Sequence, residues 1–236
     1  MKKILGLILA RGGSKGIKNK NIKVFGTKPL IYWTINRALK SKLLTDVILS
    51  TDSKKIAIIG KKFGAAVPFL RPKKYAADNS SSIDAIEHAV NFLKKKEKSY
   101  DYIFLLEPTS PFRDENDIDK SIRKILHNNS ESLISICKTE KHHPLFLFRK
   151  KNKNLLFPVE KSKKKYLRRQ DIKPVYFIDG TIYISKINTL LKKRTFCHNK
   201  TIGYELPKWK SIEIDDNLDW LLAETIHNKI FTKSNG

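Results

Sequence analysis

The sequence predicts an α/β protein with a mostly parallel sheet covered by helices on both faces. Two observations support this class. Apolar runs recur at Ile4–Leu9, Val47–Leu49, Tyr102–Leu106 and Leu133–Cys137, and helical segments separate them. Runs that are apolar throughout indicate strands buried on both faces, and strand–helix alternation is typical of parallel sheets. Such sheets bind ligands beyond the carboxyl ends of their strands, so we expect the site there.

The first half of the chain supplies the regular alternation. Pro29 fits the first turn of the first helix, and Asp117 is a candidate N-cap for the fourth. A strand-like segment, Val67–Leu70, precedes Arg71. The four expected helices are Leu30–Ser41, Lys54–Phe63, Ser82–Lys96 and Ile118–His127.

The pattern breaks between residues 138 and 174, a Lys-rich stretch that contains His and Pro. We interpret it as an arm inserted into a single domain of residues 1–236, a length that suits one buried core. The elements expected after it are a strand at Val175–Ser185, a helix near Ile187–Leu191, a strand near Thr201–Glu205 and an amphipathic helix from Asn217 to about Ile230.

The N-terminal run and the cysteines indicate the compartment. Met1–Ala10 imitates a signal peptide, but its apolar run passes straight into a Gly-rich loop, so we interpret it as a buried strand. No run approaches the roughly 18 residues that span a bilayer. Cys137 and Cys197 form no CxxC pattern, which argues against a zinc site or a disulfide framework. We therefore expect a soluble, cytoplasmic protein without a membrane partner.

The chain is strongly basic, with 48 Lys and Arg against 23 Asp and Glu, a net charge of +25 and a pI near 9.9. This charge suits nucleic acid, an anionic membrane surface or a multiply anionic substrate. It is spread along the chain, and a compositional bias toward Lys, Ile and Asn accounts for part of it. A nucleic-acid-binding protein is the weaker alternative, because no RNP aromatic pair, zinc knuckle or helix-turn-helix pattern is present.

The loop after the first apolar run, residues 10–21, has the composition of a triphosphate cradle. Its glycines allow positive φ and close approach of amide groups to an anion, and Arg11, Lys15 and Lys20 supply positive charge. The spacing matches neither a Walker loop nor the GxGxxG fingerprint. A basic turn without a ligand is the alternative.

Further polar groups follow the other predicted strands. Ser50-Thr51-Asp52 suits a ribose or the orientation of a loop, and Arg71 could donate to pyrimidine O2 or N3. The loop from Glu107 to Arg113 is stiffened by two prolines around Thr109 and Ser110, which limits the entropy lost on binding. The paired Arg168-Arg169 suits a substrate carboxylate, unless it is a surface charge pair.

Glu213-Ile214-Asp215 is the sharpest acidic feature. In a strand, residues i and i+2 project from one face, so these carboxylates could share a hard cation such as Mg²⁺ bound to a triphosphate. Asp216 and Asp219 instead look like acids at a helix N-terminus. A solvated acidic turn is the alternative.

Taken in order, these segments resemble the acylneuraminate cytidylyltransferases, which are the CMP-sialic acid and CMP-nonulosonate synthetases. The first loop and Pro108-Thr-Ser-Pro-Phe-Arg113 are the specific motifs, and the likeness covers nearly the whole chain. It implies a Rossmann-like fold of the nucleotide-diphospho-sugar transferase type with an inserted dimerisation arm. It also implies a homodimer whose arm reaches the partner's site, and a product used in cell-surface polysaccharide biosynthesis. The nucleotide would be bound by Arg11, Gly12, Gly13, Ser14, Lys15, Lys20, Asn21, Arg71, Ser80 and Ser81, of which Arg11, Lys15 and Lys20 would also be catalytic.

The same resemblance assigns the acceptor and the metal. Glu213 and Asp215 would hold Mg²⁺, and Arg169 would reach in from the partner subunit. The nonulosonic acid would meet Glu107, Thr109, Ser110, Arg169, Gln170, Asp179, Tyr183 and Phe196.

Three positions depart from the pattern of sialic acid enzymes. Glu107 stands in place of Gln, Asp179 in place of Asn, and Glu213 in place of Asp. An amide donates hydrogen bonds, whereas a carboxylate only accepts them. A sugar substrate that carries amine or amidine groups would supply the donors that these carboxylates need.

The implied reaction is attack of the acceptor's anomeric hydroxyl on the α-phosphorus of CTP, with release of pyrophosphate. Protein charge and position would drive the transfer without a covalent intermediate. The base that takes the hydroxyl proton is not identified by the sequence, and a metal-bound water is one candidate. The acceptor is expected to be N-acetylneuraminic, legionaminic or a related acid, and the alternative acceptors are a Kdo-type or pseudaminic acid. A catalytically dead sugar-nucleotide sensor is an alternative function.

Overall fold

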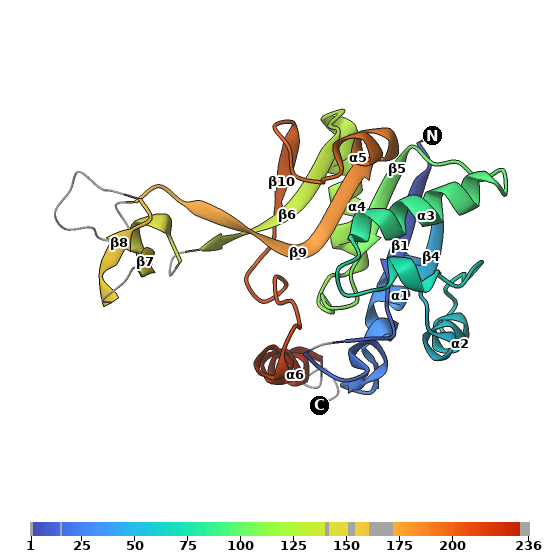
Figure 1. Cartoon of the computed structure of the whole chain (residues 1–236), viewed down its shortest axis with the longest axis horizontal. Coiled ribbons are helices and arrows are strands. Elements are labelled where there is room, and N and C mark those ends of the chain that lie inside the picture. The colour runs from blue at the N-terminus through green and yellow to red at the C-terminus, as the bar shows by residue number, and fades with distance from the viewer. Residues whose placement is uncertain (1, 15, 140–141, 151–153, 161–171, 232–236) are drawn as a thin grey trace.

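The computed structural model describes residues 2–14, 16–139, 142–150, 154–160 and 172–231. Its centre is a six-stranded sheet with the order β10-β6-β9-β5-β1-β4 (Figure 1). Strands β1, β4 and β5 are parallel, as are β6 and β10, whereas β9 runs antiparallel to both of its neighbours. The sheet is therefore mostly parallel, as the sequence predicts.

The elements lie close to their expected ranges. The sheet strands are β1 (Ile4–Leu9), β4 (Asp46–Ser50), β5 (Tyr102–Leu106), β6 (Ser132–Thr139), β9 (Val175–Lys186) and β10 (Thr201–Glu205). Short antiparallel pairs are β2 (Val24–Phe25) with β3 (Lys28–Pro29) and β7 (Phe148–Lys150) with β8 (Leu156–Pro158). The α-helices are α1 (Leu30–Lys40), α2 (Lys54–Lys62), α3 (Ser82–Lys94), α4 (Glu115–His127), α5 (Ile187–Lys193) and α6 (Asn217–Phe231). Three 3₁₀ turns are described at Lys20–Ile22, Lys73–Tyr75 and Pro144–Phe146.

Helices cover both faces of the sheet. Helices α1, α2 and α4 pack on one face, where Ile8 of β1 lies in the same core cluster as Ile35 and Ile122. Helices α3 and α5 pack on the other, where Leu7 of β1 shares a cluster with Ile86. Successive residues of β1 thus enter opposite cores, which explains why its whole sequence is apolar.

A third core cluster brings the C-terminal helix to the N-terminal loop. Phe25, buried between Trp33 and Phe112, also contacts Trp220 of α6 with ring centroids 5.6 Å apart. Ile17 and Ile214 are buried in the same cluster. This packing places the acidic segment 213–215 beside the loop that follows β1.

An arm extends from the body of the protein, as Figure 1 shows on the side of β7 and β8. Its base is the outer part of the β6–β9 ribbon, in which Cys137 pairs with Phe177 and Thr139 with Val175. The side chains of Phe177 and Ile178 are 46% and 47% exposed, although the sequence there is strongly apolar. The described part of residues 138–174 therefore projects from the sheet, with its ribbon continuing into β9.

Three local predictions require correction. Asp117 does not cap α4: Asp114 is the N-cap, and Asp117 is the third helical residue of a reciprocal capping box. Pro29 lies at the N-cap position of α1 rather than inside its first turn. The strand-like segment Val67–Leu70 forms no strand, because the chain pairs with β4 at the single bridge between Ile48 and Ala66 before it turns.

Among the described residues, no helix is both long and apolar enough to cross a membrane.

Candidate active site

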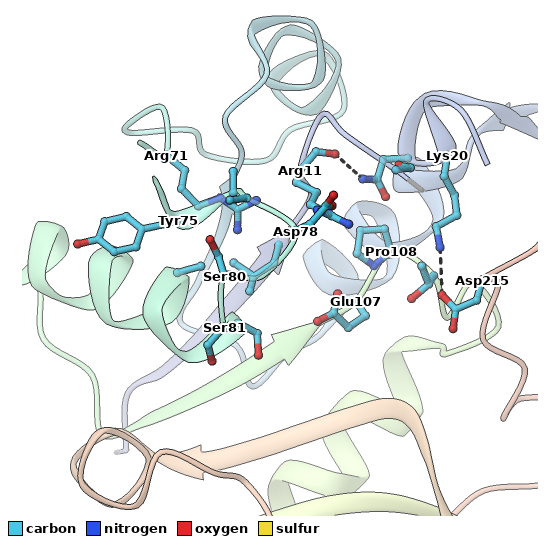
Figure 2. Close-up of a pocket in the computed structure, with 18 of the residues that line it drawn as sticks. Arg11, Lys20, Arg71, Tyr75, Asp78, Ser80, Ser81, Glu107, Pro108 and Asp215 are labelled. Atoms are coloured by element: carbon cyan, nitrogen blue, oxygen red, sulfur yellow. Dashed lines mark hydrogen bonds and ion pairs between the residues drawn. The ribbon is translucent and has the colours of Figure 1, made fainter. Parts of the chain in front are cut away.

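A cavity of about 510 Å³ opens at the carboxyl ends of β1 and β5. Figure 2 shows its lining residues converging from the loop after β1, the segment before α3 and the loop after β5. These two strands flank the point where the strand order reverses, which is where open α/β sheets bind ligands. We name this the first cavity.

Five described residues of the predicted cradle line the first cavity, namely Arg11, Ser14, Gly16, Lys20 and Asn21. Lys15 lies outside the described residues. Gly12 and Gly13 do not line it. The loop is held from behind, because Asp52 accepts a hydrogen bond of 2.8 Å from the Gly12 amide. Of the two uses suggested for Asp52, orientation of the loop is the one this contact supports.

The glycines at 12 and 13 do not adopt the expected positive φ; in this part of the loop it is Asn19 that lies in the left-handed region, at φ 55°. A Cβ at position 12 would come within 3.1 Å of the Ser53 Cβ. A Cβ at position 16 would collide with the backbone of Asp215. Gly12 and Gly16 therefore permit close approach of neighbouring segments rather than an unusual turn.

Arg71 is buried, and its guanidinium lines the first cavity. Its amide donates to the Thr51 carbonyl at 2.8 Å, which attaches the segment to the end of β4. Its Nε has no hydrogen-bond partner among the described residues, and burial lowers the pKa of the group. An unsatisfied buried donor is costly, so this site is prepared for a polar ligand.

The segment before α3 supplies the opposite wall. Ser81 caps α3 by accepting from the Ile83 amide at 3.1 Å, and Ser80 donates to the Lys74 carbonyl at 2.7 Å. Both hydroxyls border the first cavity, as does Asp78, which pairs with Arg11. A ligand that needs the Arg11 guanidinium would compete with Asp78 for it.

A second cavity of about 390 Å³ adjoins the first. Tyr183 and Phe196 form part of its wall, with ring centroids 5.3 Å apart. Ser81, Ser82 and Glu107 line both cavities. Two ligands bound in the two cavities would therefore meet at these shared residues.

Glu107 occupies the shared wall immediately after β5. Burial, with the nearby Glu213 charge, raises the pKa of its carboxyl from the ordinary 4.5 to about 7, against the opposing charges of Arg113, Arg71 and Lys20. The next residue, Pro108, restricts the backbone, and the Arg113 guanidinium donates to the Glu107 carbonyl at 3.2 Å. The carboxylate is thus held on a fixed backbone between the two cavities.

The acidic segment 213–215 belongs to no strand, contrary to the expectation from its spacing. One backbone bond, from the Ile214 amide to the Thr109 carbonyl at 2.8 Å, fixes it, and Ile214 is buried. The flanking carboxylates point outward into different spaces, since Glu213 lines the second cavity and Asp215 the first. Lys20 Nζ lies 3.1 Å from Asp215 Oδ1.

Glu213 is the more enclosed of these two acids. It accepts a hydrogen bond of 3.2 Å from Thr109, and a Cβ at position 180 would clash with its carboxylate, which explains the glycine there. Gly180 has φ 76°, a second reason for that residue type. Burial and then the charge of Asp215 raise the pKa of Glu213.

Asp179 and Ser110 reach neither cavity, so the geometry does not support their expected contact with a substrate. Both are buried, and the Asp179 carboxylate is occupied by Ser135, the Thr181 amide and Ser211. Ser110 faces the Gly180 carbonyl. Asp179 thus joins β6 and β9 to Ser211, which precedes the acidic segment. Arg169 and Gln170 lie outside the described residues.

Residues that sequence reasoning missed also border the site. Tyr75 lines the first cavity, and Arg194, Thr195 and Cys197 line the second. Arg194 pairs with Asp84 and Glu87, which joins α5 to α3. The sequence alone does not single out Arg194, because its partners Asp84 and Glu87 lie more than 100 residues away along the chain.

Comparison with known proteins agrees with this geometry. The family described as Cytidylyltransferase matches residues 5–225. The chain is 33% identical over 230 residues to N-acylneuraminate cytidylyltransferase of Escherichia coli O18:K1:H7, covering 96% of this chain but 52% of that protein. It thus spans about half the length of that relative.

Two relatives are matched over nearly their whole length. The chain is 31% identical to pseudaminic acid cytidylyltransferase of Campylobacter jejuni, covering 95% of this chain and 96% of the relative. It is likewise 31% identical to the CMP-N,N'-diacetyllegionaminic acid synthase of Legionella pneumophila, with the same coverage of 95% and 96%.

Solved structures share the fold. The structure of CMP:2-keto-3-deoxy-manno-octonic acid synthetase complexed with CTP matches with a TM-score of 0.72 at 15% identity, covering 96% of this chain and 99% of that one. The family match over most of the chain and the near-complete alignment with relatives above 30% identity lead to one conclusion: this chain is a nucleotidyltransferase of the cytidylyltransferase family.

Proposed function

We propose that this enzyme transfers the cytidylyl group of CTP to the anomeric hydroxyl of a nonulosonic acid and releases pyrophosphate. The observation that carries the proposal is the pair of cavities that share Glu107, Ser81 and Ser82. One cavity has a basic loop suited to a triphosphate, and the other has an aromatic wall suited to a sugar. The relatives described above are named as enzymes of nonulosonic acids.

In this proposal CTP occupies the first cavity. Arg11, Ser14, Lys20 and Asn21 would surround the phosphates, with Lys15 contributing from the same loop. The unsatisfied Arg71 Nε would donate to the base, and the Ser80–Ser81 turn would meet the ribose or base. Lys20 would stabilise negative charge on the transferring phosphoryl group and the leaving group.

The acceptor would occupy the second cavity, against Tyr183 and Phe196. Its anomeric oxygen would then lie at the shared wall, close to the α-phosphorus of a nucleotide in the first cavity. Positioning of two reactants in this way removes much of the entropic cost of their encounter. Arg169 and Gln170 of a partner subunit would complete the acceptor site.

The residues present fit a magnesium ion with few protein ligands. Among the described residues, no cluster of three or more His, Cys, Asp or Glu could hold a metal by itself. The charge of Asp215, however, raises the pKa of Glu213, and a cation near both carboxylates would offset that repulsion. They would hold the ion with phosphate oxygens as further ligands, where it would offset the triphosphate charge.

We further propose a homodimer formed through the arm. The exposed apolar side chains of its ribbon, Tyr176, Phe177 and Ile178, need a covering surface, and a second copy would supply one. A cytoplasmic location fits two cysteines that are both unpaired, one buried and one exposed. The product would then serve cell-surface polysaccharide synthesis.

The test is pyrophosphate release from CTP with N-acetylneuraminic, N,N'-diacetyllegionaminic, pseudaminic and Kdo acids, each with and without EDTA. We expect a metal-dependent rate with at least one of the first three acids and a CMP-sugar of the matching mass. Release with Kdo alone would replace the acceptor class. Absence of CTP binding by calorimetry in the presence of Mg²⁺ would overturn the proposal altogether.

A further inference from the structure

We propose that Glu107 is the general base of this enzyme: its carboxylate removes the proton of the acceptor's anomeric hydroxyl as that oxygen attacks the α-phosphorus. The inference rests on the proposed function and names the proton acceptor that the reaction needs.

Glu107 lies at the boundary between the two proposed binding spaces. Glu107 lines both cavities, so it borders the nucleotide space and the acceptor space at once. Figure 2 shows its carboxylate at the end of β5, on the side of the first cavity opposite Arg11. An acceptor oxygen that attacks across this shared wall would therefore pass close to the carboxylate.

The Glu107 carboxylate accepts no hydrogen bond from the described residues, unlike the other acids near it. Its neighbours at the site all accept hydrogen bonds or ion pairs from protein groups: Asp52 from Gly12, Asp78 from Arg11, Asp179 from Ser211, Glu213 from Thr109 and Asp215 from Lys20. No described residue donates to the Glu107 carboxylate. Its lone pairs are therefore free for a ligand, whereas those of its neighbours hold the site together.

The backbone of Glu107 is held in place by side-chain hydrogen bonds. The Glu107 carbonyl accepts from Arg113 at 3.2 Å and from Thr34 at 3.4 Å. Arg113 is itself fully buried and bound to the Thr181 carbonyl. This bracing orients the backbone without neutralising the carboxylate by direct contact, which suits a general base that must accept a proton and later release it.

The charges around the group favour proton transfer near neutral pH. Glu213 faces Glu107 and raises its proton affinity, while Arg113, Arg71 and Lys20 lower it. Burial is the largest influence and brings the pKa to about 7, close to the optimum for a base that works at neutral pH.

In the proposed step the acceptor oxygen forms a bond to the α-phosphorus, and the bond from the α-phosphorus to the bridging oxygen breaks. The bridging oxygen leaves with the electron pair as pyrophosphate. The hydroxyl proton passes to Glu107, and water takes it up after the product leaves.

The test compares Glu107→Gln with the parent and with Glu115→Gln. The glutamine keeps the shape and removes the base. Glu115 is a matched control, because it pairs with Arg37 and lines neither cavity. We expect Glu107→Gln to lower kcat by about 100-fold or more, with the CTP dissociation constant within twofold and the same circular dichroism spectrum. The parent's rise in kcat/KM with pH near 7 should disappear, and Glu115→Gln should behave as the parent.

Two results would overturn the inference. One is a Glu107→Gln variant with parental kcat and an unchanged pH profile. The other is a raised KM for the acceptor with kcat and the acidic limb retained, which would make Glu107 a recognition residue. Failure of the parent itself to release pyrophosphate with any acid would instead count against the proposed function. The two failures are therefore distinguishable.

Discussion

The Lys20 ammonium group joins the two ends of the chain: its Nζ lies 2.6 Å from the Ile214 carbonyl and 3.1 Å from the Asp215 carboxylate, 195 residues away. Lys20 is 13% exposed and Asp215 72%. The lysine is therefore fixed in position while its partner carboxylate remains open to a ligand. This arrangement preorganises positive charge at the proposed phosphate site without a change of conformation on binding.

Replacement of Lys20 by alanine should lower turnover by roughly two orders of magnitude or more, as does loss of one oxyanion donor in other enzymes. The physical reason is lost charge stabilisation in the transition state. Pyrophosphate release at saturating substrates measures it. Lys28→Ala is the control, because Lys28 is exposed in β3 and lines neither cavity. Parental turnover in a folded Lys20→Ala protein would remove the assigned role.

Asp215→Asn should shift the magnesium titration of the reaction to higher concentration, because an amide is a weaker ligand for a hard cation than a carboxylate. The control is Asp216→Asn, whose side chain caps α6 by accepting from the Leu218 and Asp219 amides, a role asparagine can keep. Titration of Mn²⁺ binding by electron paramagnetic resonance gives a second readout. Superimposable curves for Asp215→Asn and the parent would exclude Asp215 from the metal site.

Lys210 should be important for stability and for the position of the acidic segment. Its Nζ lies 2.5 Å from Asp114 and 2.6 Å from Asp117, and these hydrogen bonds outweigh the effect of burial and raise the pKa of Lys210. Lys210→Met would leave two partly buried carboxylates facing each other. We expect a loss of about 2–4 kcal/mol in the free energy of unfolding.

Urea denaturation measures the Lys210 effect, and Lys210→Arg should recover most of it because the positive charge is kept. Lys208→Met, an exposed neighbour, is the control. A Lys210→Met protein as stable as the parent would show that the cluster with Asp114 and Asp117 is energetically unimportant.

Glu107→Gln should increase stability at alkaline pH. The folded state raises the pKa of this carboxyl from 4.5 to about 7, so the folded protein binds the proton more tightly than the unfolded chain. That contribution to stability is complete below pH 4.5 and is lost as the pH rises through 7. At pH 8 the glutamine variant, which cannot ionise, should exceed the parent by about 1–3 kcal/mol.

The comparison requires denaturation of both proteins at pH 5 and pH 8. The advantage of the variant should shrink at pH 5, where the parent carboxyl is mostly protonated. An equal difference at both pH values would show that the effect does not come from ionisation of Glu107. If Glu107→Gln is more stable and less active than the parent, Glu107 lowers the stability of the fold in return for activity.

Phe177→Asp should weaken self-association. Phe177 lies on the exposed ribbon of the arm, paired with Cys137 of β6, so a charge there would oppose burial against another subunit without disturbing the core. Analytical ultracentrifugation should show a dimer for the parent and a monomer for the variant at micromolar concentration. Ile58→Asp, an exposed apolar position on α2, is the matched control. Identical sedimentation of the Phe177 variant and the parent would exclude this face from the interface.

The sequence by itself determined the strand–helix alternation and most of the basic loop after β1, where we propose that phosphate binds. Strands such as β1 were predictable because each is buried on both faces and therefore apolar throughout. The meeting of Arg11 and Glu107 was predictable for a related reason: polar residues that follow parallel strands meet at one edge of the sheet. Arg71 joins them although no strand directly precedes it.

The tertiary structure decided what depends on contacts between distant residues. The direction of β9 could not be inferred, because an apolar run reads alike in a parallel or an antiparallel position. Asp179 and Glu107 are both acids near the site, yet packing encloses one among hydroxyls and leaves the other facing two cavities. Charge and spacing identify which groups can do chemistry, whereas three-dimensional packing decides which of them remain available for it.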